Sequence, residues 1–173
     1  MTIFVDMDEV LADTFGAHID LYNKKYNANL TKEECLGKEV WQCVPEDCQP
    51  YIHSHTALKG FFRDLKVMPD SQEVLRELTR DNEVYIASAA MQFKTSLEEK
   101  ADWLDEHFPF LEWPYRILCG HKFILKGDVL IDDRSFNLDT FEGRSLQYTS
   151  PHNINTNGFE RVNNWEEIGK LLL

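Results

Sequence analysis

The sequence of 173 residues lacks several features that would assign it to a large class of proteins. No apolar run approaches the roughly 18–20 residues that cross a bilayer. The N-terminus, MTIFVDMDEV, lacks the basic region of a signal peptide. The four cysteines form no CxxC pair and show no zinc-type spacing with histidine. We therefore expect a cytoplasmic protein with free thiols and no membrane anchor.

Positive charge is also scarce, since 18 Lys and Arg face 30 Asp and Glu, giving a formal charge of −12 at pH 7. Binding to a nucleic-acid polymer or to an anionic membrane needs an excess of Lys and Arg, so neither partner is expected. An acidic chain can still bind a phosphorylated small molecule where a metal ion supplies local positive charge. The length and an apolar content of 43% suit one folded domain with a small insertion.

Short apolar runs alternate with helical patterns, and there is no internal repeat or low-complexity tract. The runs predict strands at 2–6, 84–88, 116–120 and 128–132, with a further candidate at 145–149. Apolar spacing and start signals predict helices over about 10–26, after Pro69-Asp70-Ser71, from 95 or 96 to 108, and over 164–172. This alternation predicts an α/β fold: a doubly wound, Rossmann-like parallel sheet covered on both faces.

Residues 28–65 interrupt this alternation with many charges, two prolines and scattered aromatics, and without a clear strand. We interpret them as a small, mostly helical cap inserted after the first strand and helix, with 1–27 and 66–173 forming the core domain. His53 and His55 in the cap stand two residues apart and so do not share a helix face. Surface positions are therefore favoured for both over a metal site.

Polar side chains follow four of the predicted strands: Asp6 and Asp8, Ser88, Lys122, and the pair Asp132 and Asp133. The carboxyl ends of parallel strands meet at one edge of the sheet, where ligands bind. Carboxylates with one open face suit Mg²⁺, and a lysine and a hydroxyl would hold the remaining oxygens of a phosphoryl group. Asp6 would then attack phosphorus and form an aspartyl-phosphate. Asp8 would pass a proton to the leaving alkoxide and afterwards activate water.

These residues stand in four motifs: DMDEVLAD at 6–13, the strand-final Ser88, a lysine ten residues before the acidic pair, and LIDD at 130–133. In this order they resemble the motifs of the haloacid dehalogenase-like (HAD) phosphatase superfamily. DMDEVLAD, GFFRDLKVMPDS at 60–71 and HK nine residues before DDR are most similar to the 5'(3')-deoxyribonucleotidases of the cytosolic and mitochondrial type. The resemblance implies a Mg²⁺-dependent phosphatase that acts on nucleoside monophosphates, with deoxy substrates favoured.

The resemblance also implies a role for each motif residue. Asp6 resembles the nucleophile and a metal ligand, and Asp8 resembles the general acid/base whose backbone carbonyl also contacts the metal. Ser88 takes the place of the hydroxyl that hydrogen-bonds the phosphoryl group, and Lys122 fits the phosphate-site lysine better than Lys126 does. In the acidic pair, Asp133 is favoured as the direct metal ligand and Asp132 as its support, an order that the sequence alone does not determine.

The chain departs from the family pattern at several places. Glu9 stands where Gly is frequent, and Ala89 stands where a second phosphate-binding Ser is frequent, which removes one phosphate contact. Thr14 occupies an aromatic position of the deoxyribonucleotidases, with Phe15 next to it. Trp41 stands where the family cap offers an aromatic wall to the base. Ala89, Phe15 and Trp41 are therefore our candidates for substrate binding beside Ser88 and Lys122.

Two other functions stay open at this point. One is the same chemistry on another small phosphate, such as a sugar phosphate or phosphoglycolate. The other is a non-catalytic nucleotide- or phosphate-binding regulator, which is disfavoured because every motif position keeps its chemistry. A homodimer is compatible with the resemblance, and the sequence does not determine the oligomeric state.

Overall fold

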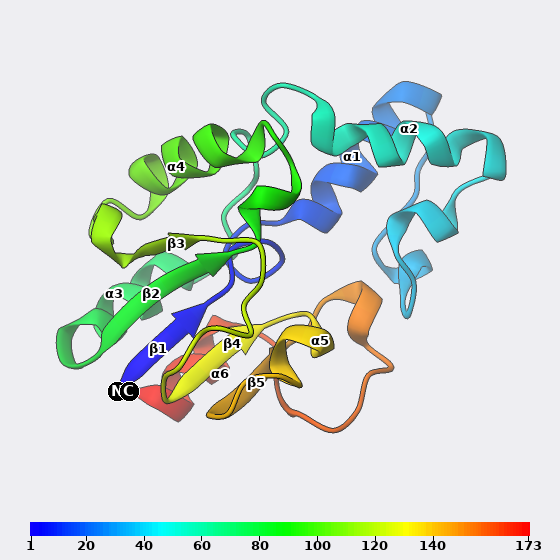
Figure 1. Cartoon of the computed structure of the whole chain (residues 1–173). Coiled ribbons are helices and arrows are strands. Elements are labelled where there is room, and N and C mark those ends of the chain that lie inside the picture. Colours follow the sequence, from blue (N-terminus) through cyan, green and yellow to red (C-terminus); the bar gives the residue numbers. More distant parts are fainter.

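The computed structural model describes all 173 residues and contains one six-stranded parallel sheet (Figure 1). The strands are β1 (Thr2–Val5), β2 (Glu83–Ser88), β3 (Arg116–Leu118), β4 (Val129–Asp132), β5 (Arg144–Tyr148) and β6 (Glu160–Val162). They lie in the order β3-β2-β1-β4-β5-β6, and every neighbouring pair is parallel. The predicted α/β fold is confirmed. Strand β6 is missing from the prediction because its three residues, ERV, form no apolar run.

Six α-helices accompany the sheet: α1 (Thr14–Tyr26), α2 (Gln49–Ser54), α3 (Ser71–Asp81), α4 (Ser96–His107), α5 (Ser135–Leu138) and α6 (Trp165–Leu172). Helix α1 begins four residues later than the apolar spacing predicts. Residues 7–12 instead form a tight loop, in which the backbone N–H groups of Leu11 and Ala12 both donate to the carbonyl of Met7. Asp13 then caps the helix by accepting from the Gly16 N–H at 2.7 Å. None of the helices is both long enough and apolar enough to cross a membrane.

Alternate residues of the strands enter two separate layers of the core. Ile3 and Val5 of β1 belong to the large cluster that contains Leu75 of α3, Leu104 of α4 and Ile168 of α6. The intervening Phe4 belongs to a smaller cluster with Leu138 of α5. Since successive strand residues point to opposite faces, α3, α4 and α6 cover one face of the sheet and α5 with nearby loops covers the other. This burial on both faces explains the continuous apolar runs of the central strands.

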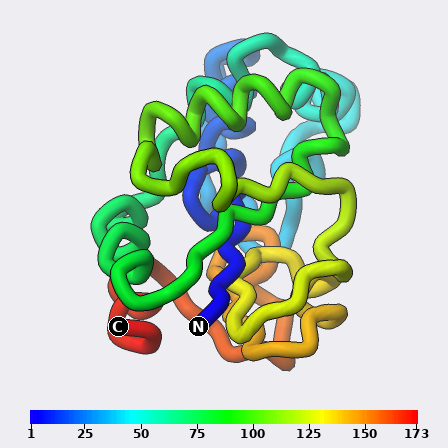
Figure 2. Tube along the Cα trace, turned by 60° about the vertical axis from the view of Figure 1, so that its left-hand side comes forward, coloured from blue at the N-terminus to red at the C-terminus, as the bar shows by residue number.

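The predicted cap region contains short 3₁₀ turns and α2, without a strand, and lies beyond the carboxyl ends of the strands (Figure 1). A hydrophobic cluster joins three residues of α1 to five residues of this region: Phe15, Ile19 and Tyr22 to Cys35, Val40, Val44, Cys48 and Ile52. Helix α1 therefore packs against the cap as well as the core, and the boundaries at 28 and 65 stay a prediction. Both chain termini lie at the opposite end of the sheet (Figures 1 and 2).

Candidate active site

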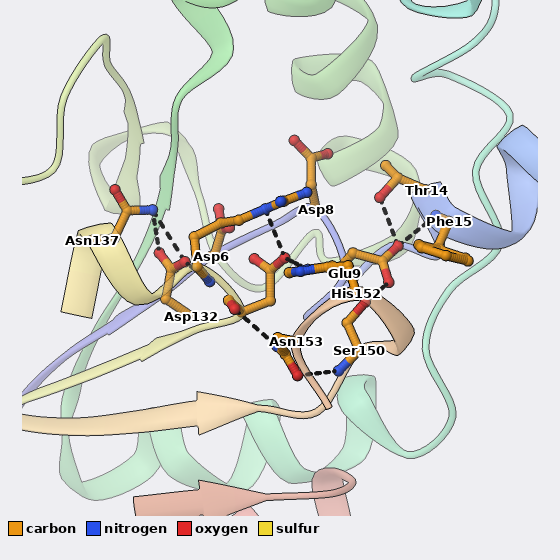
Figure 3. A network of polar contacts seen from close by, with 12 residues as sticks. Asp6, Asp8, Glu9, Thr14, Phe15, Asp132, Asn137, Ser150, His152 and Asn153 are labelled. Carbon is orange, nitrogen blue, oxygen red and sulfur yellow. Dashed lines mark hydrogen bonds and ion pairs between the residues drawn. The ribbon is translucent and has the colours of Figure 1, made fainter. Parts of the chain in front are cut away.

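The central position of β1 gathers the motif residues at one edge of the sheet. Asp6 directly follows β1, and its backbone N–H donates to the carbonyl of Ile131 in β4 at 2.9 Å. Strands β2 and β4 flank β1 and end in Ser88 and Asp132. The expected convergence of strand ends is therefore present in the structure, and Figure 3 shows the resulting polar network.

Lys122 connects two of the carboxylates. Its Nζ lies 2.6 Å from Oδ1 of Asp6 and 2.6 Å from Oδ2 of Asp132, and its side chain is buried. Burial by itself would lower the pKa of Lys122, but the charges of Asp6 and Asp132 outweigh it and hold that pKa above its ordinary value. Lys126, the alternative from the sequence, is exposed at the surface. Lys122 is thus the lysine that the loop after β3 delivers to the acidic residues.

The two acids after β4 have different surroundings. Both oxygens of Asp132 are occupied, because Lys122, the Arg134 N–H and the Asn137 amide all donate to this carboxylate. Figure 3 shows the two bonds from Asn137. In Asp133, Oδ2 accepts from His152 Nε2 at 2.6 Å and lies 3.2 Å from Arg134 Nε, whereas no protein donor reaches Oδ1. Asp132 is therefore saturated by the protein, and Asp133 keeps an oxygen for a ligand.

Oxygens of Asp6, Asp132 and Asp133 all lie within 4.8 Å of one another. Burial raises the pKa of Asp6 to about 7, with Lys122 opposing the shift and Asp132 and Asp8 adding to it. Burial and the neighbouring charge of Asp132 also hold the pKa of Asp133 well above its ordinary value. Asp6 and Asp133 each keep an oxygen free of protein donors, and with the neighbouring charge of Asp132 they form a set that fits a divalent cation such as Mg²⁺. In Asp6 this free oxygen is Oδ2.

The carboxylate of Asp8 lies outside this cluster and pairs with a residue that the sequence did not reveal. Lys100 of α4 places its Nζ 2.5 Å from Oδ2 of Asp8 and 2.9 Å from Oγ of Ser88, and 4.8 Å from the centre of the Phe62 ring. Only 1% of the Lys100 side chain is exposed. The many acids of 98–106 suggest a solvated helix face, but Lys100 within this stretch is buried. Its spacing of four from the buried residues Ser96 and Leu104 is the signal that would have found it.

Glu9 connects the loop after β1 to its neighbours. Its backbone lies in the left-handed region with φ 62°, which explains why Gly is frequent at this position of the family. Its buried carboxylate accepts hydrogen bonds from Oγ1 of Thr14, from the N–H of Phe15 and from Oγ of Ser150 (Figure 3). Burial raises the pKa of Glu9 even though these three donors oppose the shift. The side chain thereby ties the start of α1 to the loop after β5.

Two adjoining cavities open at this edge of the sheet. The first has a volume of about 360 Å³ and contains Asp6, Asp8, Ala89, Lys122 and Asp133 in its wall. The second, of about 390 Å³, reaches the cap and is lined by several apolar and aromatic side chains, among them Phe15, Val40, Trp41 and Ile52. The two cavities share part of their walls, namely Glu9, Thr14, His18, Thr56, Gln92, Phe93 and Arg134.

The predicted substrate-binding residues fall in different places. Ala89 lines the first cavity, while Phe15 and the 37% exposed Trp41 line the second. Ser88 is fully buried beside Lys100 and lies in neither wall. His53 is exposed as expected, but the expected surface position of His55 is wrong, because its side chain is 0% exposed. The sequence missed that the His55 ring packs against His18, 37 residues away.

A parallel sheet in this order, with acids at the ends of its first and fourth strands and a cap beyond them, has the fold of the haloacid dehalogenase-like class. The fold matches a haloacid dehalogenase-like family hydrolase from Streptococcus pneumoniae with a TM-score of 0.58 at 14% identity, covering 98% of this chain and 97% of the other. At that identity the likeness concerns the fold alone.

Sequence comparison gives the family. The model of the 5' nucleotidase, deoxy (pyrimidine), cytosolic type C family matches residues 1–173. The chain is 39% identical over 171 residues to a 5'(3')-deoxyribonucleotidase of Bacillus subtilis (strain 168), covering 99% of this chain and 98% of the relative. It is 44% identical over 172 residues to a Staphylococcus aureus (strain Mu50) protein provisionally given the same name, covering 99% and 95%. The chain therefore belongs to this family and is a phosphoric monoester hydrolase.

Proposed function

We propose that the protein is a Mg²⁺-dependent 5'(3')-deoxyribonucleotidase that works through an aspartyl-phosphate on Asp6. The observation that carries this proposal is the arrangement of the Asp6 carboxylate. Oδ1 of Asp6 accepts from the Met7 N–H at 2.8 Å and contacts Lys122, whereas Oδ2 has no protein donor. Asp6 also lines the first cavity. A carboxylate fixed through one oxygen and free at the other suits in-line attack on phosphorus.

Asp6 and Asp133, together with the backbone carbonyl of Asp8, would hold the Mg²⁺ ion. When bound, that ion would neutralise negative charge on the phosphoryl oxygens. Asp132 serves as support, since its own oxygens are bound to Lys122, Asn137 and the Arg134 N–H. Lys122 keeps a positive charge beside the nucleophile throughout the reaction. This assignment of the two acids agrees with the free Oδ1 of Asp133.

The reaction then uses two side chains in turn. Oδ2 of Asp6 attacks phosphorus, the bond from phosphorus to the leaving oxygen breaks, and Asp8 gives its proton to that oxygen. In the second half, Asp8 takes a proton from a water molecule as the water oxygen attacks phosphorus. The bond to Asp6 breaks, inorganic phosphate leaves, and Asp8 regains the proton it gave. Lys100 holds Oδ2 of Asp8, and Oδ1 is buried without a protein partner, so Lys100 is the residue that orients this carboxyl group.

The second cavity supports a nucleoside as the leaving group. Its wall contains Phe15 and Trp41, aromatic side chains of the kind that bind a planar base, and it adjoins the cavity that holds Asp6. The two bacterial relatives that carry the name 5'(3')-deoxyribonucleotidase support the same substrate class. A small sugar phosphate would leave this aromatic-lined space without a role.

The test compares substrates and one variant. With Mg²⁺, we expect deoxynucleoside 5'- and 3'-monophosphates to be hydrolysed faster than sugar phosphates, and EDTA to stop turnover. Asp6→Asn should abolish hydrolysis of every substrate, while Asp102→Asn, which changes an exposed acid on α4, should leave it intact. Equal rates on sugar phosphates and deoxynucleotides would refute the nucleotidase function. Wild-type turnover in Asp6→Asn would refute the aspartyl-phosphate mechanism.

A further inference from the structure

Two histidines meet beside the cavities without a role in the phosphoryl-transfer steps. His18 lies in α1 and lines both cavities, and its Nδ1 is 2.9 Å from Nδ1 of His55 in the cap. The two rings stack with centroids 5.1 Å apart and planes 21° apart. His18 stands at the junction between the acidic cavity and the cavity that contains Trp41. A group bound there would lie between the phosphate and the base of a nucleotide.

The contact between the two Nδ1 atoms fixes how protons are distributed. A hydrogen bond between two imidazole nitrogens needs one donor and one acceptor, so the pair carries a single proton between its rings. Burial lowers the pKa of both His18 and His55 to about 4, so both rings are neutral near pH 7. Each ring therefore has one protonated nitrogen, and only two arrangements of the pair are available.

The surroundings of His55 favour one of these arrangements. Its ring is fully buried, with the Tyr51 ring 4.5 Å away edge-on and Phe61 on another side, and its Nε2 has no hydrogen-bond partner. A proton on that Nε2 would be a buried N–H group without an oxygen or nitrogen acceptor, which folded proteins avoid more strictly than an unpaired acceptor. The proton of His55 therefore lies on Nδ1 and is donated to Nδ1 of His18. His18 consequently carries its own proton on Nε2.

The Nε2 atom of His18 is open to the cavities. It has no hydrogen bond within the protein, and unlike Nε2 of His55 it is not among the fully buried nitrogens. The proposed phosphate site lies at the Lys122 end of the first cavity, whereas His18 also lines the second cavity. Its neutral N–H donor is therefore placed for an uncharged acceptor oxygen beyond the phosphate. Such oxygens belong to the sugar and to the base of a nucleoside.

We propose that His18 is a substrate-binding residue that donates a hydrogen bond from Nε2 to an oxygen of the nucleoside, and that His55 is a positioning residue that fixes this tautomer. The inference rests on the proposed nucleotidase function. It assigns to the pair a part in choosing the leaving group, separate from the phosphoryl chemistry of Asp6 and Asp8.

The first experiment separates binding of the nucleoside from chemistry. His18→Phe keeps a ring but removes the donor. His107→Gln, at the end of α4 and in the wall of neither cavity, is the control. Losing one neutral hydrogen bond should raise KM for thymidine 5'-monophosphate about fivefold to tenfold and change kcat less than twofold. The ratio of kcat/KM for this nucleotide to that for p-nitrophenyl phosphate should fall by the same factor. An unchanged ratio in His18→Phe would overturn the proposal.

A third substrate locates the acceptor oxygen. If His18→Phe lowers kcat/KM for 2-deoxyribose 5-phosphate as much as for the nucleotide, the acceptor oxygen belongs to the sugar. If only the nucleotide is affected, it belongs to the base. Wild-type protein that hydrolyses p-nitrophenyl phosphate but no nucleotide would refute the proposed function itself, and the proposal on His18 with it. The proposal on His18 fails alone if the wild type hydrolyses nucleotides normally and His18→Phe leaves the ratio of the two kcat/KM values unchanged.

The second experiment observes the tautomer directly. Nitrogen-15 spectra of the histidine rings at pH 7 should show His18 protonated at Nε2 and unprotonated at Nδ1. His55→Phe should remove this preference and raise KM for the nucleotide. His55→Asn, whose amide can still donate to Nδ1 of His18, should keep part of the preference and raise KM less. If the His55 variants fail to fold, the wild-type spectrum decides. A proton on Nδ1 of His18 would overturn the assignment.

Discussion

The ion pair between Lys100 and Asp8 should contribute to both stability and turnover, and Lys100→Met tests it. Methionine keeps most of the length of the side chain but removes the charge, and with it the cation–π contact of Nζ with the Phe62 ring. Removing one partner of a fully buried ion pair costs about 3–5 kcal/mol because the other charge is left unpaired. The Lys100 side chain is 1% exposed, but that of Asp8 is 33% exposed, so water compensates part of the loss. We expect a loss of about 2–3 kcal/mol in the free energy of unfolding.

The assay is urea denaturation of four proteins: wild type, Lys100→Met, Asp8→Asn and the double variant. Because the two groups are in direct contact, the double variant should be more stable than the sum of the single losses predicts by about 2 kcal/mol. Lys94→Met, which changes an exposed lysine just before α4, is the control and should change stability by less than about 0.5 kcal/mol. If the stability loss of the double variant equals the sum of the two single losses to within about 0.5 kcal/mol, the pairing is refuted.

Turnover should respond as well, since Lys100 orients the proposed general acid. A carboxylate displaced by about 1 Å costs on the order of 10²-fold in rate, and we expect a fall in kcat of about 10–100-fold in Lys100→Met. The fall should be similar for a nucleotide and for p-nitrophenyl phosphate, because both need the proton from Asp8. A selective effect on the nucleotide would instead mean that Lys100 contacts the leaving group.

Three further predictions concern other parts of the site. First, the pKa values of His18 and His55 are lowered to about 4 in the folded protein. Below about pH 6.5 the unfolded chain therefore binds protons at these histidines while the folded chain does not. Their contribution to stability is complete above about pH 6.5 and is lost as the pH falls toward about 4. Urea denaturation should show a steeper loss of stability over this range in wild type than in His18→Phe. Second, Glu9→Gly relieves the positive φ but removes three hydrogen bonds, and a net loss of about 1–3 kcal/mol is expected in the same assay. Third, Mg²⁺ should raise the Tm of the wild type, and Asp133→Asn should abolish most of this rise, as differential scanning fluorimetry with and without EDTA would show.

The sequence was sufficient for the features that depend on local pattern and strand order. Apolar runs predicted five of the six strands, and the rule that parallel strand ends meet at one edge predicted that Asp6, Asp132 and Lys122 come together. What it did not reveal depends on contacts across long stretches of chain. Lys100 is 92 residues from Asp8, and His55 is 37 residues from His18. A lysine among acids and a histidine in a polar helix look like surface residues until the fold shows which face is covered.

The charge balance at the sheet edge bears on the −12 of the whole chain. Three cations stand near the proposed phosphate position, and all are already paired: Lys122 with Asp6, Lys100 with Asp8, and Arg134 with Asp133 at 3.2 Å and with Glu39. A phosphate monoester brings further negative charge to a site where carboxylates already equal or outnumber their partners. Binding of the phosphate there requires positive charge that the side chains alone do not supply. A cation held by the free oxygens of Asp6 and Asp133 would supply this charge. This balance supports the proposed dependence on Mg²⁺, and it explains how a strongly acidic protein can act on an anionic nucleotide.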